Sequence, residues 1–87
     1  MKIDGIIISG EFDELNNEFY LQRVKYHNTA SILKKTQWSY LYHYLKGHSD
    51  NKDGQIITLY DQMLIPLSQE EIRQFIDDLE TLEPKYH

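Results

Sequence analysis

The chain has 87 residues, no cysteine and a formal net charge of −5 with its four histidines neutral. This length allows one small domain over residues 1–87, and the lack of cysteine excludes disulfides, thiolate metal sites and cysteine nucleophiles. Apolar runs reach only three residues, far short of the ~20 that cross a bilayer, and Asp4 and Gly5 do not fit a secretory signal. We therefore expect a cytoplasmic protein that makes no membrane contact.

The first third of the chain predicts a β-hairpin. Residues 3–12 are rich in β-branched side chains and punctuated by glycines, which favours a strand. Residues 13–17 are turn-like, and their two asparagines adopt positive φ at low cost. Residues 18–27 alternate loosely between apolar and polar side chains, which indicates a second strand. The alternative is a helix from Asp13 that aligns three apolar side chains, namely Leu15, Phe19 and Tyr26.

The middle of the chain predicts a long helix over residues 30–46. Thr29 or Asn28 can cap its start, and Gly47 supplies a left-handed stop at its end. The residues that follow, 48–54, are polar and indicate a loop.

Two short apolar runs, residues 55–60 and 63–67, predict a second hairpin. Pro66 has no N–H to donate to a ladder, so its strand should lie at a sheet edge.

A final helix is predicted from a Ser-x-x-Glu capping box, Ser68 with Glu71, to about Leu82. An apolar stripe at helical spacing runs along it: Ile72, Phe75, Ile76, Leu79 and Leu82. The side away from the stripe is acidic, and three of its residues are candidates for docking a basic partner: Asp77, Asp78 and Glu80. They lie toward the negative end of the helix dipole, so local stability does not account for them. A solvated face that aids solubility is the alternative.

These elements follow the order ββαββα. Each hairpin has one face to bury, and each helix can cover part of such a face. The sequence therefore predicts an α+β domain in which the two hairpins form an antiparallel four-stranded sheet, with both helices packed on one face.

The helix over residues 30–46 carries more apolar surface than one contact requires. On a helical wheel its apolar side chains cover roughly 200°, about twice the stripe of an ordinary surface helix. Either the helix is central and covered on two sides, or part of the arc is exposed to a partner. In the second case the anchors are aromatic residues of the kind that dominates interfaces, Trp38, Tyr40 and Tyr42.

Charge is segregated along the chain. Residues 1–22 hold one base and five acids, residues 23–49 five bases and no acid, and residues 50–87 three bases and nine acids. The middle segment also holds five aromatic residues, and bases interleaved with aromatics are typical of surfaces that bind nucleic acid. The candidate phosphate contacts are Arg23, Lys25, Lys34, Lys35 and Lys46. A solvated cationic face is the alternative.

Motifs for catalysis, metal binding or cofactor binding are not found in the sequence. Residues 49–56 resemble part of an EF-hand loop, but Ser49 stands at position one and Tyr60 at position twelve, where a bidentate glutamate is required. His43 and His48 lie five residues apart without a zinc motif around them. We expect no enzymatic activity, no cofactor, no metal and no small-molecule substrate.

The leading hypothesis is a small, non-catalytic module that binds a protein partner or a second copy of itself. Small acidic domains without cysteine are common among accessory proteins of phages and mobile elements, including inhibitors of host enzymes, which is an analogy of class. The alternative is a nucleic-acid-binding domain that uses residues 23–49.

Overall fold

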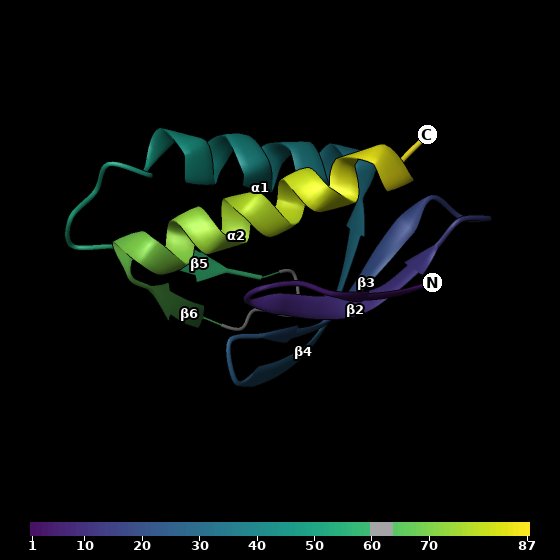
Figure 1. Cartoon of the computed structure of the whole chain (residues 1–87), viewed down its shortest axis with the longest axis horizontal. Helices are drawn as coiled ribbons and strands as arrows, with labels where there is room; N and C mark the ends of the chain where they lie inside the picture. Colours follow the sequence, from purple (N-terminus) through teal and green to yellow (C-terminus); the bar gives the residue numbers. More distant parts are fainter. Residues whose placement is uncertain (60–63) are drawn as a thin grey trace.

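The computed structural model describes residues 1–59 and 64–87 and has a layer of strands beneath a layer of helices (Figure 1). The strands are β1 (Lys2–Asp4), β2 (Ile8–Asp13), β3 (Glu18–Val24), β4 (His27–Lys34), β5 (Gln55–Thr58) and β6 (Leu64–Leu67). The helices are α1 (Lys35–Gly47) and α2 (Gln69–Leu82), and α2 runs into a 3₁₀ turn, η1 (Glu83–Lys85).

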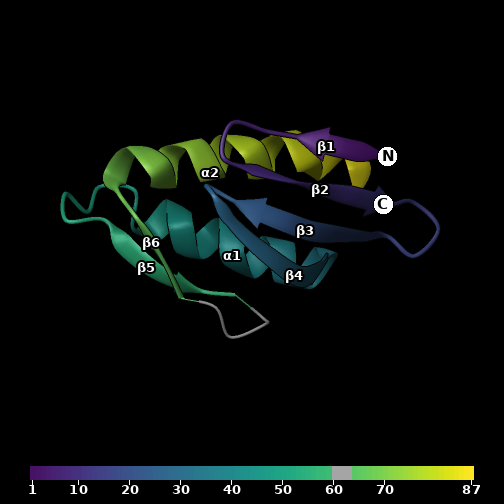
Figure 2. The ribbon, with the colours of Figure 1, turned by 90° about the horizontal axis from the view of Figure 1, so that it is seen from below.

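The strands form two sheets. The strands β1, β2, β3 and β4 make one antiparallel sheet in that order, and β5 pairs with β6 in a separate antiparallel sheet. Seen from below, the strands lie in front of α1 and α2, which run side by side behind them (Figure 2). The α+β class and the four-stranded antiparallel sheet are as predicted. The prediction that two hairpins build this sheet is wrong, because its four strands all precede α1.

The segment predicted as one strand, residues 3–12, is two strands joined by a short turn. β1 and β2 pair antiparallel, and the Gly5 N–H donates to the carbonyl of Ile8 (2.8 Å) between them. β2 in turn pairs with β3, which confirms the strand rather than the helix for the segment after the turn. Asn17 takes the positive φ expected of that turn, at 56°.

β4 occupies the first part of the segment predicted as a helix over residues 30–46. Along β4, Ser31 and Leu33 are buried while Ala30 and Ile32 point to solvent, which is the alternation of a strand. β4 pairs with β3 along its length. The pairing with β3 therefore outweighs the helix propensity of the local sequence.

The predicted cap at the start of the first helix is wrong as well. Thr29 and Asn28 lie inside β4, and the start of α1 is closed instead by the side chain of Gln37, which accepts from the Lys34 N–H (2.8 Å). The predicted end is right to within one residue, since Gly47 is the last residue of α1, but the backbone of Gly47 is not left-handed.

The second hairpin is present as β5 and β6, and Pro66 lies in an edge strand as predicted. The predicted strand ends and the break between them, residues 60–63, lie outside the described residues. Gly54 precedes β5 with a φ of +77°, and a Cβ on it would lie 2.1 Å from the carbonyl oxygen of Leu67. The entry to the hairpin therefore requires glycine.

α2 matches its prediction at both ends. The Ser68 hydroxyl accepts from the Glu71 N–H (3.2 Å), and the Glu71 carboxylate accepts from the Ser68 N–H (2.8 Å), which is the expected capping box. The whole apolar stripe is buried: Ile72, Phe75, Ile76, Leu79 and Leu82.

Asp78 is a buried carboxylate on α2, 5% exposed, and the prediction that it lies on a solvated face is wrong. Its Oδ1 accepts from the N–H of Ile6 (2.8 Å), and its Oδ2 accepts from the N–H groups of Ile7 (2.8 Å) and Ile8 (3.0 Å). Gly5 packs so closely that a Cβ on it would lie 2.5 Å from the Asp78 carboxyl carbon. The carboxylate thus fixes the β1–β2 connection against α2.

Replacing Asp78 tests this contact. Asp78→Ala leaves three backbone N–H groups without an acceptor, so we expect a loss of about 3 kcal/mol or more in the free energy of unfolding. The matched control is Asp77→Ala, which removes the exposed neighbouring carboxylate and should change stability by less than about 0.5 kcal/mol. Urea unfolding at constant m-value measures both, and equal midpoints would contradict a structural role for Asp78.

Two further glycines form a second matched pair. A Cβ on Gly10 would lie 2.0 Å from the carbonyl oxygen of Tyr20 on the neighbouring strand, whereas a Cβ on Gly47 would meet nothing within 4 Å. Gly10→Ala should therefore destabilise the fold by about 2 kcal/mol or more. Gly47→Ala should stabilise it by about 0.5 kcal/mol, because alanine loses less backbone entropy. Thermal unfolding of the two variants gives the comparison.

Tyr86 closes one end of the core after η1. It is 7% exposed, its hydroxyl donates to the carbonyl of Leu33 (2.8 Å), and its ring meets that of Phe12 edge-on at 5.0 Å between centroids. Burial raises the pKa of Tyr86 well above its ordinary value. The folded state therefore holds the neutral phenol, and the chain's C-terminal end is tied to β4.

This burial predicts a pH dependence of stability. Because the folded-state pKa of Tyr86 is raised, its contribution is complete below the unfolded pKa of about 10 and is lost as the pH rises above it. Tyr86→Phe should cost about 1 kcal/mol at pH 8 and should show a shallower loss of stability between pH 9.5 and 11 than the wild type. Urea unfolding across this range measures the slope, with the exposed Tyr26→Phe as control. Identical slopes for Tyr86→Phe and the wild type would contradict the prediction.

Candidate protein-contact surface

Trp38 is a core residue. It is 6% exposed, its Nε1 donates to the Leu79 carbonyl on α2 (2.8 Å), and its ring stacks on Tyr42 with centroids 5.1 Å apart. Trp38 therefore joins α1 to α2 and offers a partner almost no surface. Of the two alternatives for the first helix, a covered helix or an exposed arc, Trp38 fits the covered one.

Tyr42 and Glu80 are already joined to each other across the two helices. The Tyr42 hydroxyl donates to Glu80 Oε2 (2.6 Å), and this hydrogen bond, with burial and the nearby carboxylates, raises the pKa of Tyr42. The ammonium of Lys46 lies over the same ring, with Nζ 5.9 Å from its centroid. Asp77 remains exposed beside them, and its role in binding stays a prediction.

The five bases of the nucleic-acid alternative lie in separate places. Lys25 forms an ion pair with Glu71 (3.0 Å), and Lys34, at the other end of β4, faces Glu18 (3.9 Å). The Arg23 Nε donates to the Ser9 hydroxyl (3.1 Å), and its guanidinium also reaches the Lys25 carbonyl. These contacts place acids or backbone acceptors beside the cations that were candidates for phosphate binding.

The remaining two bases stand far apart along α1. Lys35 is exposed at its first residue, and Lys46 near its end lines a hollow of about 350 Å³ together with Arg73, Asp77 and Glu80 of α2. Acidic side chains of α2 therefore share the surface around Lys46.

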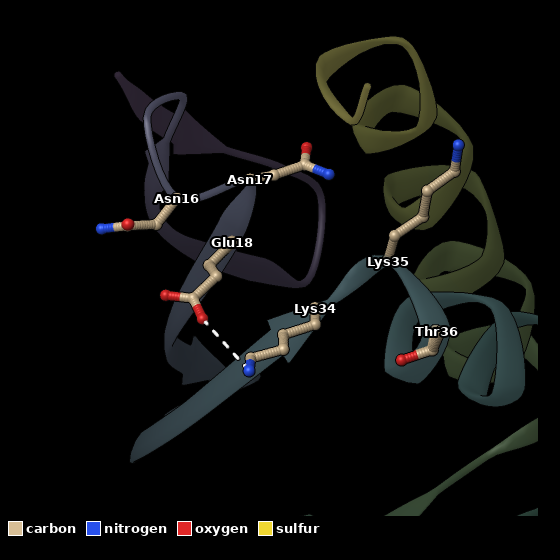
Figure 3. A pocket seen from close by; sticks show the side chains of 6 residues that line it. All are labelled: Asn16, Asn17, Glu18, Lys34, Lys35 and Thr36. Carbon is tan, nitrogen blue, oxygen red and sulfur yellow. Dashed lines mark ion pairs between the residues drawn. The ribbon is translucent and has the colours of Figure 1, made fainter.

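A polar hollow of about 660 Å³ lies where the β2–β3 turn approaches the start of α1 (Figure 3). It is lined by Asn16, Asn17, Glu18, Lys34, Lys35 and Thr36. The Lys34 ammonium turns toward Glu18, while Lys35 extends away toward the end of α2 (Figure 3). Asn17 exchanges two hydrogen bonds with the backbone of His87 (2.7 and 2.9 Å). Three of the lining side chains are therefore engaged within the protein, Lys34 with Glu18 and Asn17 with His87.

The loop that resembles an EF-hand is arranged as a turn. Asn51 Oδ1 accepts from the Asp53 N–H (3.1 Å), so it is engaged within the loop itself. No group of three histidine, aspartate or glutamate side chains in residues 1–59 and 64–87 is arranged to hold a metal ion. Tyr60, at the twelfth position of the resemblance, lies outside the described residues.

The outer face of the second hairpin is apolar. Ile56 and Leu64 point away from the core and are 59% and 64% exposed, and Pro66, directly opposite Ile56, is exposed beside them. Tyr40 of α1 is 69% exposed, and it lines a groove between α1 and β5 together with Ile56. We call these four residues the apolar surface. Of the predicted anchors, only Tyr40 belongs to it.

A groove of about 220 Å³ lies next to the apolar surface, between α1 and β5. Leu41 and Ile57 are buried at its base, while Tyr40, Tyr44, Ile56 and Thr58 line it from the two sides. The Tyr44 hydroxyl accepts from the Gln55 side chain (2.6 Å), which holds the helix and the strand at this spacing. The groove thus has apolar walls supplied by one helix and one strand.

The apolar surface has a signal in the sequence, in the two pairs of consecutive apolar residues of the second hairpin. Consecutive apolar residues in a strand point to opposite faces, so Ile56-Ile57 and Leu64-Ile65 require an apolar outer face if their partners are buried. Ile57 and Ile65 are indeed buried, at 2% and 0% exposure.

Comparisons with family models, curated proteins and solved structures found no match to this chain. Within the described part of the chain, neither helix has the length and apolar composition to cross a membrane. The surface geometry is therefore the evidence from which a function is inferred.

Proposed function

We propose that this protein is a small, non-catalytic module that binds a protein partner through the apolar surface of Tyr40, Ile56, Leu64 and Pro66. The observation that carries the proposal is the exposure of three large apolar side chains on adjoining elements, at 69%, 59% and 64%. Such clusters on a soluble domain are typical of interaction sites, because burying them against a partner removes apolar surface from water. Tyr40 adds an aromatic ring of the kind enriched at interfaces.

The distribution of charge favours a protein over a nucleic acid as the partner. The net charge is −5, and Lys25 and Lys34, two of the five candidate phosphate contacts, already face carboxylates. Binding to phosphates would require these cations to leave their partners and overcome a repulsive net field. The proposal includes the expectation that the module has no catalytic activity. Its size and charge are common among accessory proteins of phages and mobile elements.

The proposal predicts that polar substitutions on the apolar surface abolish partner binding. The double variant Ile56→Asp, Leu64→Asp should weaken affinity for the partner by at least about tenfold, since each buried anchor commonly contributes more than 1 kcal/mol. Both side chains point to solvent, so the fold should remain intact. The measurement is calorimetric titration with a partner first captured by cross-linking and then purified.

The matched control is Tyr26→Asp, which alters an aromatic residue that is 80% exposed on the β3–β4 turn. It should bind as the wild type does. If the double variant and the control keep the same affinity as the wild type, the apolar surface is not the site of contact.

A further inference from the structure

Pro66 determines which way the backbone of β5 faces. Pro66 lies directly opposite Ile56, and in antiparallel pairs such residues either exchange two hydrogen bonds or none. Proline cannot donate, and the Pro66 carbonyl accepts from Lys25 Nζ (3.1 Å) on the side away from β5. The Ile56–Pro66 pair is therefore the kind without mutual hydrogen bonds, and the N–H and C=O of Ile56 point away from β6.

The other side of β5 is the groove described above. Because the two kinds of pair alternate along a ladder, the backbone groups of Thr58 face the same way as those of Ile56. Among residues 1–59 and 64–87, no strand pairs with β5 on that side, and β5 is an edge of its two-stranded sheet. The backbone N–H and C=O groups of Ile56 and Thr58 thus lie beside the groove that Tyr40 and Tyr44 line.

We infer that the groove between α1 and β5 binds an extended segment of a partner protein as an added strand. The inference rests on the proposed protein-binding function and specifies its mode. The segment's backbone hydrogen-bonds to Ile56 and Thr58, and its alternate side chains enter the groove onto Leu41 and Ile57. A peptide strand is the ligand that satisfies an edge and an adjacent apolar trough at the same time.

The extent of the surface selects a short segment over a second copy of this chain. The exposed parts of Tyr40, Ile56 and Leu64 amount to on the order of 300 Å² of apolar surface. A stable dimer buries about 800 Å² on each partner, of which roughly 65%, or about 500 Å², is apolar, so these side chains fall short of what a dimer needs. The net charge of −5 adds a long-range attraction for a segment with lysine or arginine at its ends. The inferred occupant is therefore an extended apolar peptide with basic flanks.

The probe for this inference is a displayed library of random linear peptides, from which binders to the folded protein are selected and synthesised. Enriched peptides should have apolar residues at alternate positions. N-methylation of every second backbone nitrogen in one phase should weaken binding by about tenfold or more, and in the other phase should leave it unchanged. This dependence on phase is a property of strand pairing and requires no change to the protein.

Variants of Ile56 provide the matching test on the protein side. Ile56→Pro removes an N–H that the hairpin itself does not use, whereas Ile56→Ala keeps the N–H and shortens the side chain. We expect Ile56→Pro to bind the selected peptides about tenfold more weakly than Ile56→Ala, with both folds verified by their amide NMR spectra. In the wild type, the amides of Ile56 and Thr58 should gain protection from hydrogen exchange when peptide is added.

The outcomes separate this inference from the proposed function. Peptide binding that is insensitive to methylation phase and to Ile56→Pro, but is lost in the Ile56→Asp, Leu64→Asp variant, overturns strand addition and leaves the apolar surface as the contact. A library without binders, or a dimer in sedimentation that Ile56→Pro dissociates, overturns the peptide as occupant. If the Ile56→Asp, Leu64→Asp variant still binds both the partner and the peptides as the wild type does, both proposals are overturned.

Discussion

The contact between Asp78 and the β1–β2 connection joins the two layers of this molecule. A carboxylate taken out of water costs several kcal/mol unless hydrogen bonds replace its hydration, and Asp78 receives three from consecutive backbone N–H groups. The contact spans more than 70 residues of sequence, from Ile6 to α2. With the sheet fixed there, the adjacent Leu79 can place its carbonyl where the Trp38 indole reaches it and so position α1.

The parts of the fold with local signals could be predicted from the sequence. α2 is one example, since both its capping box and its apolar stripe lie within fifteen residues and need no knowledge of the rest of the chain. The β2–β3 hairpin is another, because its turn and its β-branched strand are adjacent. For such elements the local and tertiary preferences agree.

The parts without a signal of their own in the sequence could not be predicted. Residues 30–34 suit a helix as well as a strand, and pairing with the preceding strand β3 selects the strand. The turn between them, Lys25 and Tyr26, holds none of the residues that mark a hairpin in sequence. Placed in a helix, residues 30–34 widen the apolar arc, and the wider arc favours Trp38 as an exposed anchor. The burial of Asp78 has no signal in the sequence, because its partners are backbone N–H groups, which every residue but proline carries. The candidate site accordingly lies on the outer face of β5 and β6 together with Tyr40 of α1, and not on the acidic face of α2.

Pro66 also has a consequence for assembly of the protein with itself. Sheets grow into fibres only when each unit presents two adhesive edges, one to receive a neighbour and one to offer. On the β6 side of the small sheet, proline lacks the donor and Lys25 occupies its carbonyl, so this edge is poorly suited to pairing. The small sheet is therefore adhesive on one side only. Stacking of copies would need the β6 edge of one to pair with the β5 edge of the next, and Pro66 opposes that contact.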